Sequence, residues 1–382
     1  MSGRVRRANG NTKAAKWNSA VLRRLRERLD HDPEKDIVDM LTPAYSNHLE
    51  FWKQAAAGPD AQDGVPPKDA SPEGESSMLD PVSILRFDDV RSDLYDATDV
   101  NVLSPITAQL LTLFHGVCIC QGIKNMLARG KIVYRALSTI FIVDSKFAVK
   151  VSPKNLITEH NMLNYVHYHL KDFPAPKAHG LVQLGGYHIM FSTHVPGYTL
   201  QEAWPELNLG DRHKISIQLG DIVRRLRTVQ HCQGNPLGGV WGEGCKDARY
   251  DVRDAELTIR SVTDFENWLY TASQCTRPCV AFVNGLIDKD EGAAVFLSHG
   301  DLIPENIIVR QTEEETWQIE AVVDWDSSGF YPEYWEAFKA THGVHTTLGF
   351  EWSHYIPDII SPRRYPTRWM ADRLLERGME HA

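Results

Sequence analysis

The residue types and spacings best suited to chemistry lie between positions 297 and 326. The chain reads Leu-Ser-His-Gly-Asp-Leu-Ile-Pro-Glu-Asn-Ile-Ile-Val over 297–309 and Ala-Val-Val-Asp-Trp-Asp over 321–326. In a phosphoryl-transfer loop an aspartate accepts the proton of the attacking hydroxyl, and an asparagine five residues later binds a metal ion. Asp301 and Asn306 have this spacing, and Asp324 follows 18 residues later. A lone aspartate in such a loop is more often a cap, but the joint spacing favours phosphoryl transfer with Mg²⁺, which prefers oxygen ligands.

The segments upstream predict a small sheet followed by a mainly helical region. Residues 131–137, 140–143 and 147–151 have strand character and are separated by turn residues, so we expect three consecutive antiparallel strands. Helices are predicted over 104–127 and 159–170, and further apolar strands near 181–184 and 188–191. From residue 200 onward the pattern is mostly helical, apart from one hairpin around 307–323.

Several motifs together resemble one family. His-Gly-Asp-x-x-x-x-Asn at 299–306, followed by Val-Asp-Trp-Asp at 323–326, resembles the aminoglycoside phosphotransferase and choline kinase-like family, a branch of the protein-kinase-like fold. Gly-Phe-Tyr-Pro-Glu-Tyr-Trp-Glu at 329–336 resembles a stretch of its many uncharacterised fungal members, and Met-Phe-Ser-Thr-His-Val-Pro-Gly-Tyr-Thr-Leu at 190–200 resembles the hinge between its lobes. The resemblance covers roughly residues 103–345. It implies a bilobal α/β (α+β) fold, with an antiparallel sheet in a small lobe and a large, mainly helical lobe.

The resemblance also implies an activity and its residues. It makes Asp301 the catalytic base, and Asn306 and Asp324 the ligands of a metal ion, Mg²⁺, that accompanies ATP. The implied reaction is transfer of the γ-phosphoryl group to a hydroxyl group. A small-molecule acceptor is favoured, because after Asp326 we find neither the Asp-Phe-Gly nor the Ala-Pro-Glu motif of protein kinases. A protein Ser/Thr kinase and a catalytically inactive nucleotide-binding module stay open as alternatives.

Four further residues are implied for nucleotide binding. Lys150 of Phe-Ala-Val-Lys would pair with the phosphates, and Glu159, nine residues later in the next predicted helix, is close enough to hold its ammonium group by an ion pair. The backbone of Thr193 and Val195 in the hinge segment would face the edge of the adenine ring.

Two features leave alternatives open. The turn at 136–139, Ala-Leu-Ser-Thr, lacks the glycines of a phosphate-binding loop, although its serine and threonine could cap a phosphate instead. Asp326 would face the same side as Asp324 if both lie on a strand. As an exposed turn residue, Asp326 would instead face solvent or a substrate amine.

Charge and composition limit the class of protein. The 42% hydrophobic and 24% charged residues are typical of a globular chain, and the net charge of −9 argues against a general nucleic-acid binder. No apolar stretch approaches the roughly 20 residues that span a bilayer, and no apolar segment follows the charged first residues as in a secretory signal. The six cysteines lack metal-ligand spacing and are interpreted as free thiols. We therefore expect a cytoplasmic protein without a membrane span.

The chain is predicted to have four regions. Residues 1–56 form a basic extension, whose first 29 residues hold nine Lys or Arg and one acid and include an amphipathic helix over 16–29. Residues 57–80 form an acidic, Pro- and Gly-rich linker. The nucleotide-binding lobe is expected over 81–192, and the catalytic and substrate-binding lobe over 193–382.

Overall fold

The computed structural model describes residues 90–232, 234–247, 249, 253–271, 277–287, 293–342 and 351–377, together with Leu22 and Arg26. The helix predicted over 16–29 lies outside the described residues, apart from those two exposed helical positions, and so does the linker predicted over 57–80. The chain divides into two compact units: Met1–Asp96 with Tyr134–Thr139, and Ala97–Val133 with Ile140–Ala382. The second, larger unit contains the residues assigned to catalysis, metal binding and nucleotide binding, whereas Ser138 and Thr139 of the turn at 136–139 belong to the first unit.

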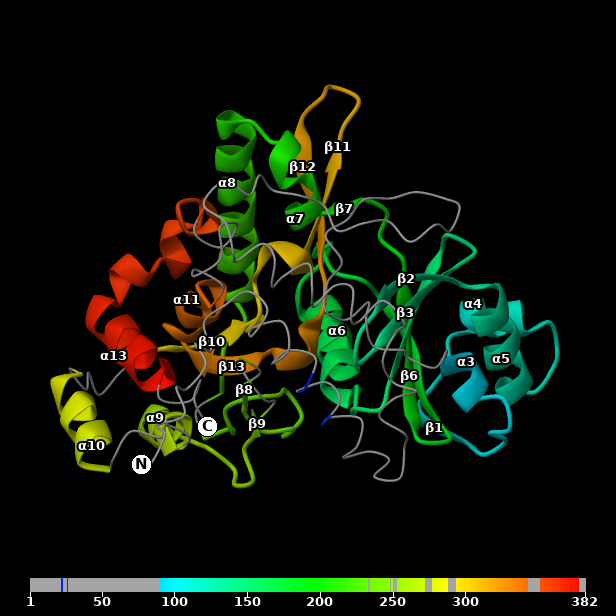
Figure 1. Ribbon diagram of the computed structural model, residues 1–382, viewed down its shortest axis with the longest axis horizontal. Coiled ribbons are helices and arrows are strands. Elements are labelled where there is room, and N and C mark those ends of the chain that lie inside the picture. Colours follow the sequence, from blue (N-terminus) through cyan, green and yellow to red (C-terminus); the bar gives the residue numbers. More distant parts are fainter. Residues whose placement is uncertain are drawn as a thin grey trace, which may run out of the picture. The chain divides into compact units, whose positions relative to one another are not determined.

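A six-stranded sheet precedes the mainly helical part of the chain, and most of its residues belong to the larger unit (Figure 1). Its strands, in spatial order, are β1 (Val100–Ser104), β5 (Ala178–Leu184), β6 (Tyr187–Thr193), β4 (Phe147–Ser152), β3 (Thr139–Val143) and β2 (Lys131–Arg135). Pairs β1–β5, β5–β6 and β4–β6 are antiparallel. Every second residue of β3 and β4 is buried, the pattern of strands with one face on the core. The predicted antiparallel sheet is confirmed, whereas β1 was not predicted.

The helix predicted over 104–127 is wrong in extent. After α4 (Ala108–Leu111) and a short 3₁₀ turn (Thr112–Phe114), His115 and Gly116 adopt left-handed backbone conformations with φ of 52° and 77°. The chain then starts again as α5 (Ile119–Arg129) at an angle of 79° to the first piece. Within the described residues no single helix is long and apolar enough to cross a membrane, and this bent pair meets the length and composition criteria only when taken together. The helix predicted over 159–170 is present as α6 (Ile157–His169).

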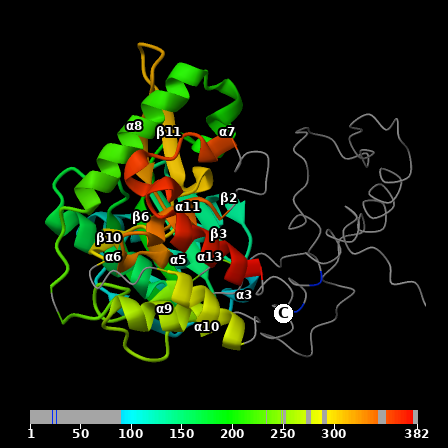
Figure 2. The same cartoon turned by 90° about the vertical axis from the view of Figure 1, so that its left-hand side faces the viewer.

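The second part of the larger unit is mainly helical. In Figures 1 and 2 helix α11 lies beside α13, the last helix of the described chain, and Arg373 of α13 donates a hydrogen bond to the carbonyl of Phe338 of α11. The predicted hairpin is present as β11 and β12, whereas the pair β10–β13 was not predicted. The helices are α7 (Leu200–Ala203), α8 (Leu209–Leu226), α9 (Val262–Thr271), α10 (Arg277–Leu286), α11 (Trp335–Ala340) and α13 (Pro366–Arg377). The strands are β7 (Tyr198–Thr199), β8 (Lys246–Asp247), β9 (Arg253–Asp254), β10 (Val295–Ser298), β11 (Ile307–Gln311), β12 (Trp317–Val322) and β13 (Gly329–Pro332).

The main hydrophobic core holds the loop that carries the predicted chemistry. This core is built from α6, α8 and strands of both parts of the larger unit. Leu297 precedes the loop, Leu302 lies within it and Ile307 follows it, and all three side chains are buried in this core. Because buried side chains fix the backbone that bears them, the polar residues between these anchors have defined positions.

Candidate active site

Asp301 and Asn306 lie together at the loop that joins β10 to β11. The side-chain N–H groups of Asn306 donate to Asp301 twice, to its Oδ2 at 2.8 Å and to its backbone carbonyl at 3.0 Å. Desolvation raises the pKa of Asp301, and the positive charge of Lys339 opposes this shift. The spacing of five residues thus brings a carboxylate and an amide side chain into one hydrogen-bonded unit.

His299 fixes the backbone before Asp301 as a neutral ring. Its Nε2 is 3.1 Å from the carbonyl of Val323, and its Nδ1 accepts a 3.2 Å hydrogen bond from the N–H of Asp301. One ring nitrogen must therefore donate and the other accept, which is the pattern of an uncharged imidazole. Burial lowers the pKa of His299 to about 4. Its ring packs edge-on against the buried Trp325, 4.6 Å between centroids, and so ties the loop to the segment after β12.

Glu336 holds the same loop from α11. Its carboxylate accepts hydrogen bonds from the N–H of His299 at 2.7 Å and from the N–H of Gly300 at 3.1 Å. Burial raises the pKa of Glu336 to about 7, although both backbone donors favour the charged form. The sequence prediction assigned no role to Glu336, because a glutamate within an apolar stretch has no local signature of a contact 36 residues away.

Gly300 allows the loop to approach the next segment closely. Its φ is +76°, and a Cβ at this position would lie 2.3 Å from the carbonyl oxygen of Ser327. Only glycine fits without displacing one of the two segments, because a left-handed conformation and a backbone contact of this kind both exclude a side chain. Gly300 therefore sets the distance between the loop of Asp301 and the turn that follows Asp324.

Lys150, Glu159 and Asp324 form the charged centre of the site. Lys150, on β4, donates through Nζ to Glu159 Oε2 of α6 and to Asp324 Oδ1, both at 2.7 Å. The ion pair expected between Lys150 and Glu159 is confirmed. The positive charge of Lys150 lowers the pKa of Asp324, whereas burial raises the pKa of Glu159 to about 7 against the opposing effect of Lys150. The two carboxylates in turn raise the pKa of Lys150 despite its burial, so its ammonium stays charged.

The residues predicted to bind metal fit a magnesium ion that has other ligands as well. Asp324 has a left-handed backbone (φ 64°) at the start of the 3₁₀ turn Trp325–Ser327, and its side chain is 46% exposed although Lys150 binds one oxygen. Within the described chain no three His, Cys, Asp or Glu side chains gather to hold a metal by themselves. Mg²⁺ commonly takes one or two protein carboxylates and completes its shell with phosphate oxygens and water. The Asn306 and Asp324 side chains supply donors of this kind.

The hinge and the turn at 136–139 are more restrained than the sequence suggested. The N–H of Thr193 donates to the carbonyl of Lys177 at 2.9 Å, and its hydroxyl is 2.9 Å from Nε2 of His179. Val195 lies outside the strands and helices, and among the described residues its N–H, unlike that of Thr193, donates to no backbone carbonyl. Of the two turn hydroxyls, Thr139 is buried and Ser138 is half-buried.

Asp326 has a partner that the sequence did not predict. Lys246, on β8, donates through Nζ to Asp326 Oδ1 at 2.9 Å, and the side chains of the two residues are 11% and 26% exposed. Asp326 lies in the short turn after Asp324 rather than on a strand. Its carboxylate is thus bound to a protein cation instead of facing only solvent.

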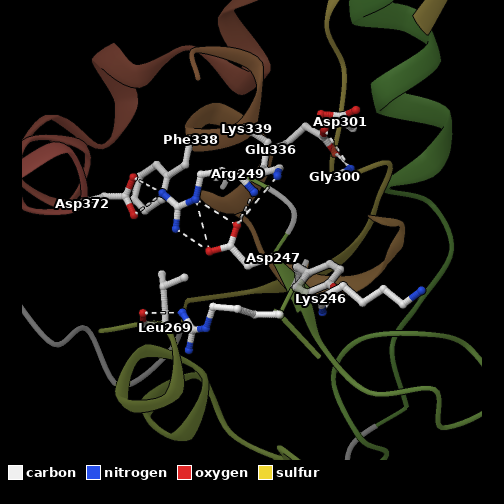
Figure 3. Close-up of polar contacts among 12 residues, drawn as sticks. Lys246, Asp247, Arg249, Leu269, Gly300, Asp301, Glu336, Phe338, Lys339 and Asp372 are labelled. Carbon is white, nitrogen blue, oxygen red and sulfur yellow. Dashed lines mark hydrogen bonds and ion pairs between the residues drawn. The ribbon is translucent and has the colours of Figure 1, made fainter. Parts of the chain in front are cut away.

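Directly after Lys246 in the chain, Asp247 and Arg249 form a buried ion network with Asp372 (Figure 3). The guanidinium of Arg249 donates to both oxygens of Asp247, at 2.9 and 2.8 Å, and to both oxygens of Asp372, at 2.9 and 2.8 Å. None of the three side chains is more than 4% exposed, and Lys339 Nζ lies 3.8 Å from Asp247. Because a buried charge needs hydrogen-bonded partners, this network fixes β8 against helix α13.

Comparison with known proteins identifies the family. The model of the phosphotransferase enzyme family matches residues 137–354, more than half of the chain. No curated protein matches the chain.

Among solved structures, the apo form of a thermostable mutant of aminoglycoside phosphotransferase APH(4)-Ia is 16% identical, with a TM-score of 0.43 over 65% of this chain and 83% of that one. The GDP and kanamycin complex of APH(2")-IIia is 11% identical, with a TM-score of 0.43 over 71% and 97% of the two chains. The streptomycin–ATP complex of APH(2")-IIa is 9% identical, with a TM-score of 0.44 over 72% and 88%. Because the family model matches more than half of the chain, the chain belongs to the phosphotransferase enzyme family, and its own structure is an α+β fold in which an antiparallel sheet precedes a mainly helical part.

Proposed function

We propose that this protein transfers the γ-phosphoryl group of ATP, with Mg²⁺, to a hydroxyl group of a small molecule. The observation that carries the proposal is the placement of Lys150, whose ammonium is 2.7 Å from both Glu159 and Asp324. A lysine held by a helix glutamate beside a metal-binding aspartate is the arrangement that positions nucleotide phosphates in kinases. The membership of the phosphotransferase family supports the same reaction class.

Each proposed role follows from the chemistry of the side chain. Asp301 orients the acceptor hydroxyl and takes its proton while the acceptor oxygen forms a bond to phosphorus and the bond to the ADP oxygen breaks. Mg²⁺, held by Asn306 and Asp324, would neutralise phosphate charge when it is bound with ATP. Lys150 exchanges Asp324 for phosphate oxygens and keeps its bond to Glu159. Val195 is half-buried, and its backbone N–H would face the adenine edge.

A small acceptor is supported by the short connection after Asp324. Strand β13 begins at Gly329, five residues after Asp324, and α11 begins at Trp335. A protein kinase has a long activation segment at this point, on which a peptide substrate docks. The described chain offers no such segment between Asp324 and α11, so we propose a small molecule as the acceptor.

Two variants test the proposal. Asp301→Asn keeps the shape of the side chain and removes the proton acceptor, so turnover should fall by about 10²–10⁴-fold while the affinity for MgATP stays the same. Lys150→Met removes a phosphate ligand and should weaken MgATP binding as well. Calorimetry gives the affinities, and ATP consumption in the presence of a panel of hydroxyl compounds gives the turnover.

Three results would contradict the proposal. Full turnover in Asp301→Asn would refute its role as base. MgATP binding without ATP consumption on any acceptor would support an inactive nucleotide-binding module. Transfer of label from ATP to a protein mixture, and not to a metabolite extract, would support a protein kinase.

A further inference from the structure

The loop of Asp301 contains no positive charge. Residues 299–306 include neither lysine nor arginine. During transfer the phosphoryl group carries negative charge on three oxygens, and enzymes place fixed cations where this charge develops. Lys150 lies at the small-lobe side on β4. Lys339 of the large lobe acts on Asp301 electrostatically, but its side chain is 2% exposed and its ammonium lies 3.8 Å from Asp247. Another large-lobe cation is therefore needed if the transferring group is to be held from both sides.

Lys246 is a large-lobe lysine that reaches the charged centre. Its ammonium binds Asp326, two residues after Asp324, and its positive charge contributes to the lowered pKa of Asp324. Asp326 in turn acts electrostatically on Glu159. Lys150 and Lys246 thus lie in one cluster with the carboxylates of Glu159, Asp324 and Asp326. The formal charge of the whole cluster is −1, and it would become +1 with a bound divalent metal ion.

The strand that carries Lys246 is unusually well fixed. The N–H of Lys246 donates at 2.9 Å to the hydroxyl of the buried Tyr331, and the next residue, Asp247, is clamped by Arg249. Because neighbouring side chains on a strand point to opposite faces, Lys246 leaves β8 on the side away from Asp247 (Figure 3). The buried network therefore acts as a rigid base from which the lysine extends toward Asp326.

Burial of a lysine–aspartate pair contributes little to stability. The desolvation of two charges offsets most of their attraction, and apolar residues of similar size often stabilise a protein as well. The side chain of Lys246 is only 11% exposed, and its partner Asp326 lies two residues after the proposed metal ligand Asp324. A cation held in this way is prepared to interact with an anion that enters the cluster.

We propose that Lys246 is the second cation of the phosphoryl-transfer site and binds oxygens of the γ-phosphoryl group as it moves from ADP to the acceptor. This inference rests on the proposed function. In the step, the acceptor oxygen forms a bond to phosphorus, the bond from phosphorus to the ADP oxygen breaks, and the hydroxyl proton goes to Asp301. Lys246 keeps its own protons and shifts a hydrogen bond from Asp326 to the phosphoryl oxygens.

The full-length protein with Lys246→Met, Lys246→Arg and Lys246→Gln tests this inference. Lys214→Met is the matched control, because Lys214 is an exposed lysine of the same lobe on α8. Three quantities are measured: the rate of ATP hydrolysis with water as acceptor, the affinity for MgADP, and the gain in MgADP affinity when aluminium fluoride is added as a mimic of the transferring group. Lys246→Gln covers the case in which the methionine variant does not fold, since it keeps a hydrogen-bond donor for Asp326.

The expected results separate transfer from binding and from folding. Lys246→Met and Lys246→Gln should slow hydrolysis by about 10²-fold or more, as loss of one transition-state contact does, and should abolish the gain from aluminium fluoride. MgADP affinity should stay within about threefold of the wild type, because the contact belongs to the transition state. Lys246→Arg should recover part of the rate, and Lys214→Met should behave as the wild type.

Two outcomes would overturn the inference while leaving the proposed function intact. Normal hydrolysis in Lys246→Met would remove the role in transfer. A parallel loss of hydrolysis, MgADP affinity and melting temperature, without recovery in Lys246→Arg, would make Lys246 a structural residue only. If the wild-type protein itself bound no MgATP, the proposed function would fail, and the inference would fall with it.

Discussion

Substitution of Gly300 by alanine tests whether the close approach of two backbone segments sets the active geometry. The new Cβ would lie 2.3 Å from the carbonyl oxygen of Ser327, whereas carbon and oxygen in contact are about 3.3 Å apart. One segment must therefore move by about 1 Å, and a misplacement of that size can slow a reaction by about 10²-fold. The left-handed backbone adds about 1–2 kcal/mol of strain, and the overpacking adds about 1–3 kcal/mol.

Gly116→Ala is the matched control for this prediction. Gly116 has nearly the same φ, +77°, but its Cβ would meet no atom within 4 Å. The left-handed strain and the reduced entropy of the unfolded chain are common to both substitutions, so the difference between them isolates the close approach. Urea titration should show Gly300→Ala to be less stable than Gly116→Ala by about 1–3 kcal/mol, and ATP turnover should fall only in Gly300→Ala. Equal stability and equal turnover in the two variants would refute the reasoning.

Three further predictions concern metal, buried charge and pH. Asp324→Ala removes a proposed ligand of Mg²⁺. Calorimetry should therefore give this variant the same affinity for ATP with Mg²⁺ present as with Mg²⁺ removed by a chelator. A higher affinity in the presence of Mg²⁺ would contradict this prediction. Asp372→Asn weakens the ion pair through which Arg249 contacts α13. Urea titration should show that the free energy of unfolding falls by about 3–5 kcal/mol. A change within experimental error would show that Asp247 alone satisfies the guanidinium. Burial raises the pKa of Glu336 from an ordinary 4.5 to about 7. The folded protein therefore binds the carboxyl proton of Glu336 more tightly than the unfolded chain does. The stability that comes from this tighter binding is fully present below pH 4.5 and is lost as the pH rises through 7. Glu336→Gln resembles the protonated side chain at every pH, and the stability of the wild type relative to this variant should therefore fall by about 3 kcal/mol between pH 4.5 and 7.5; a constant difference over that range would contradict the shift.

The part of the site that could be predicted from sequence is the part made by short chain segments. Lys150 and Glu159 are nine residues apart, on a strand and the helix after it, so the local direction of the chain brings them together. Asp301 and Asn306 are separated by a single loop. Their placement follows from spacing, whereas the roles assigned to them stay predictions.

The contacts that could not be predicted join segments far apart in the sequence. Glu336 binds the backbone of Gly300 across 36 residues, and Lys246 binds Asp326 across 80 residues. Such contacts leave no periodic pattern, because each partner alone looks like an ordinary charged residue. The lysine at 246 and the glutamate at 336 become recognisable only when the fold shows what they face.

The fold shows the same division between local and distant signals. Strands β3 and β4 alternate between buried and partly exposed residues and were predicted, whereas all four residues of β13 are buried and offer no alternation. The break between α4 and α5 falls at His115 and Gly116, and the apolar pattern continues across it, so the sequence around these two residues did not indicate the end of a helix. The helix predicted over 104–127 was therefore too long.

The bridge from Lys150 to both Glu159 and Asp324 would make the proposed binding of metal and nucleotide thermodynamically cooperative. Without ligands, the ammonium of Lys150 occupies an oxygen of Asp324 that the proposed Mg²⁺ requires. A metal ion that takes this carboxylate frees the lysine for phosphate, and phosphate that takes the lysine frees the carboxylate for metal. By linkage, each ligand then raises the affinity for the other by the same factor. The chain's own ion pair would thus act as a competitor of both ligands, and it would favour the complete MgATP complex over either ligand alone.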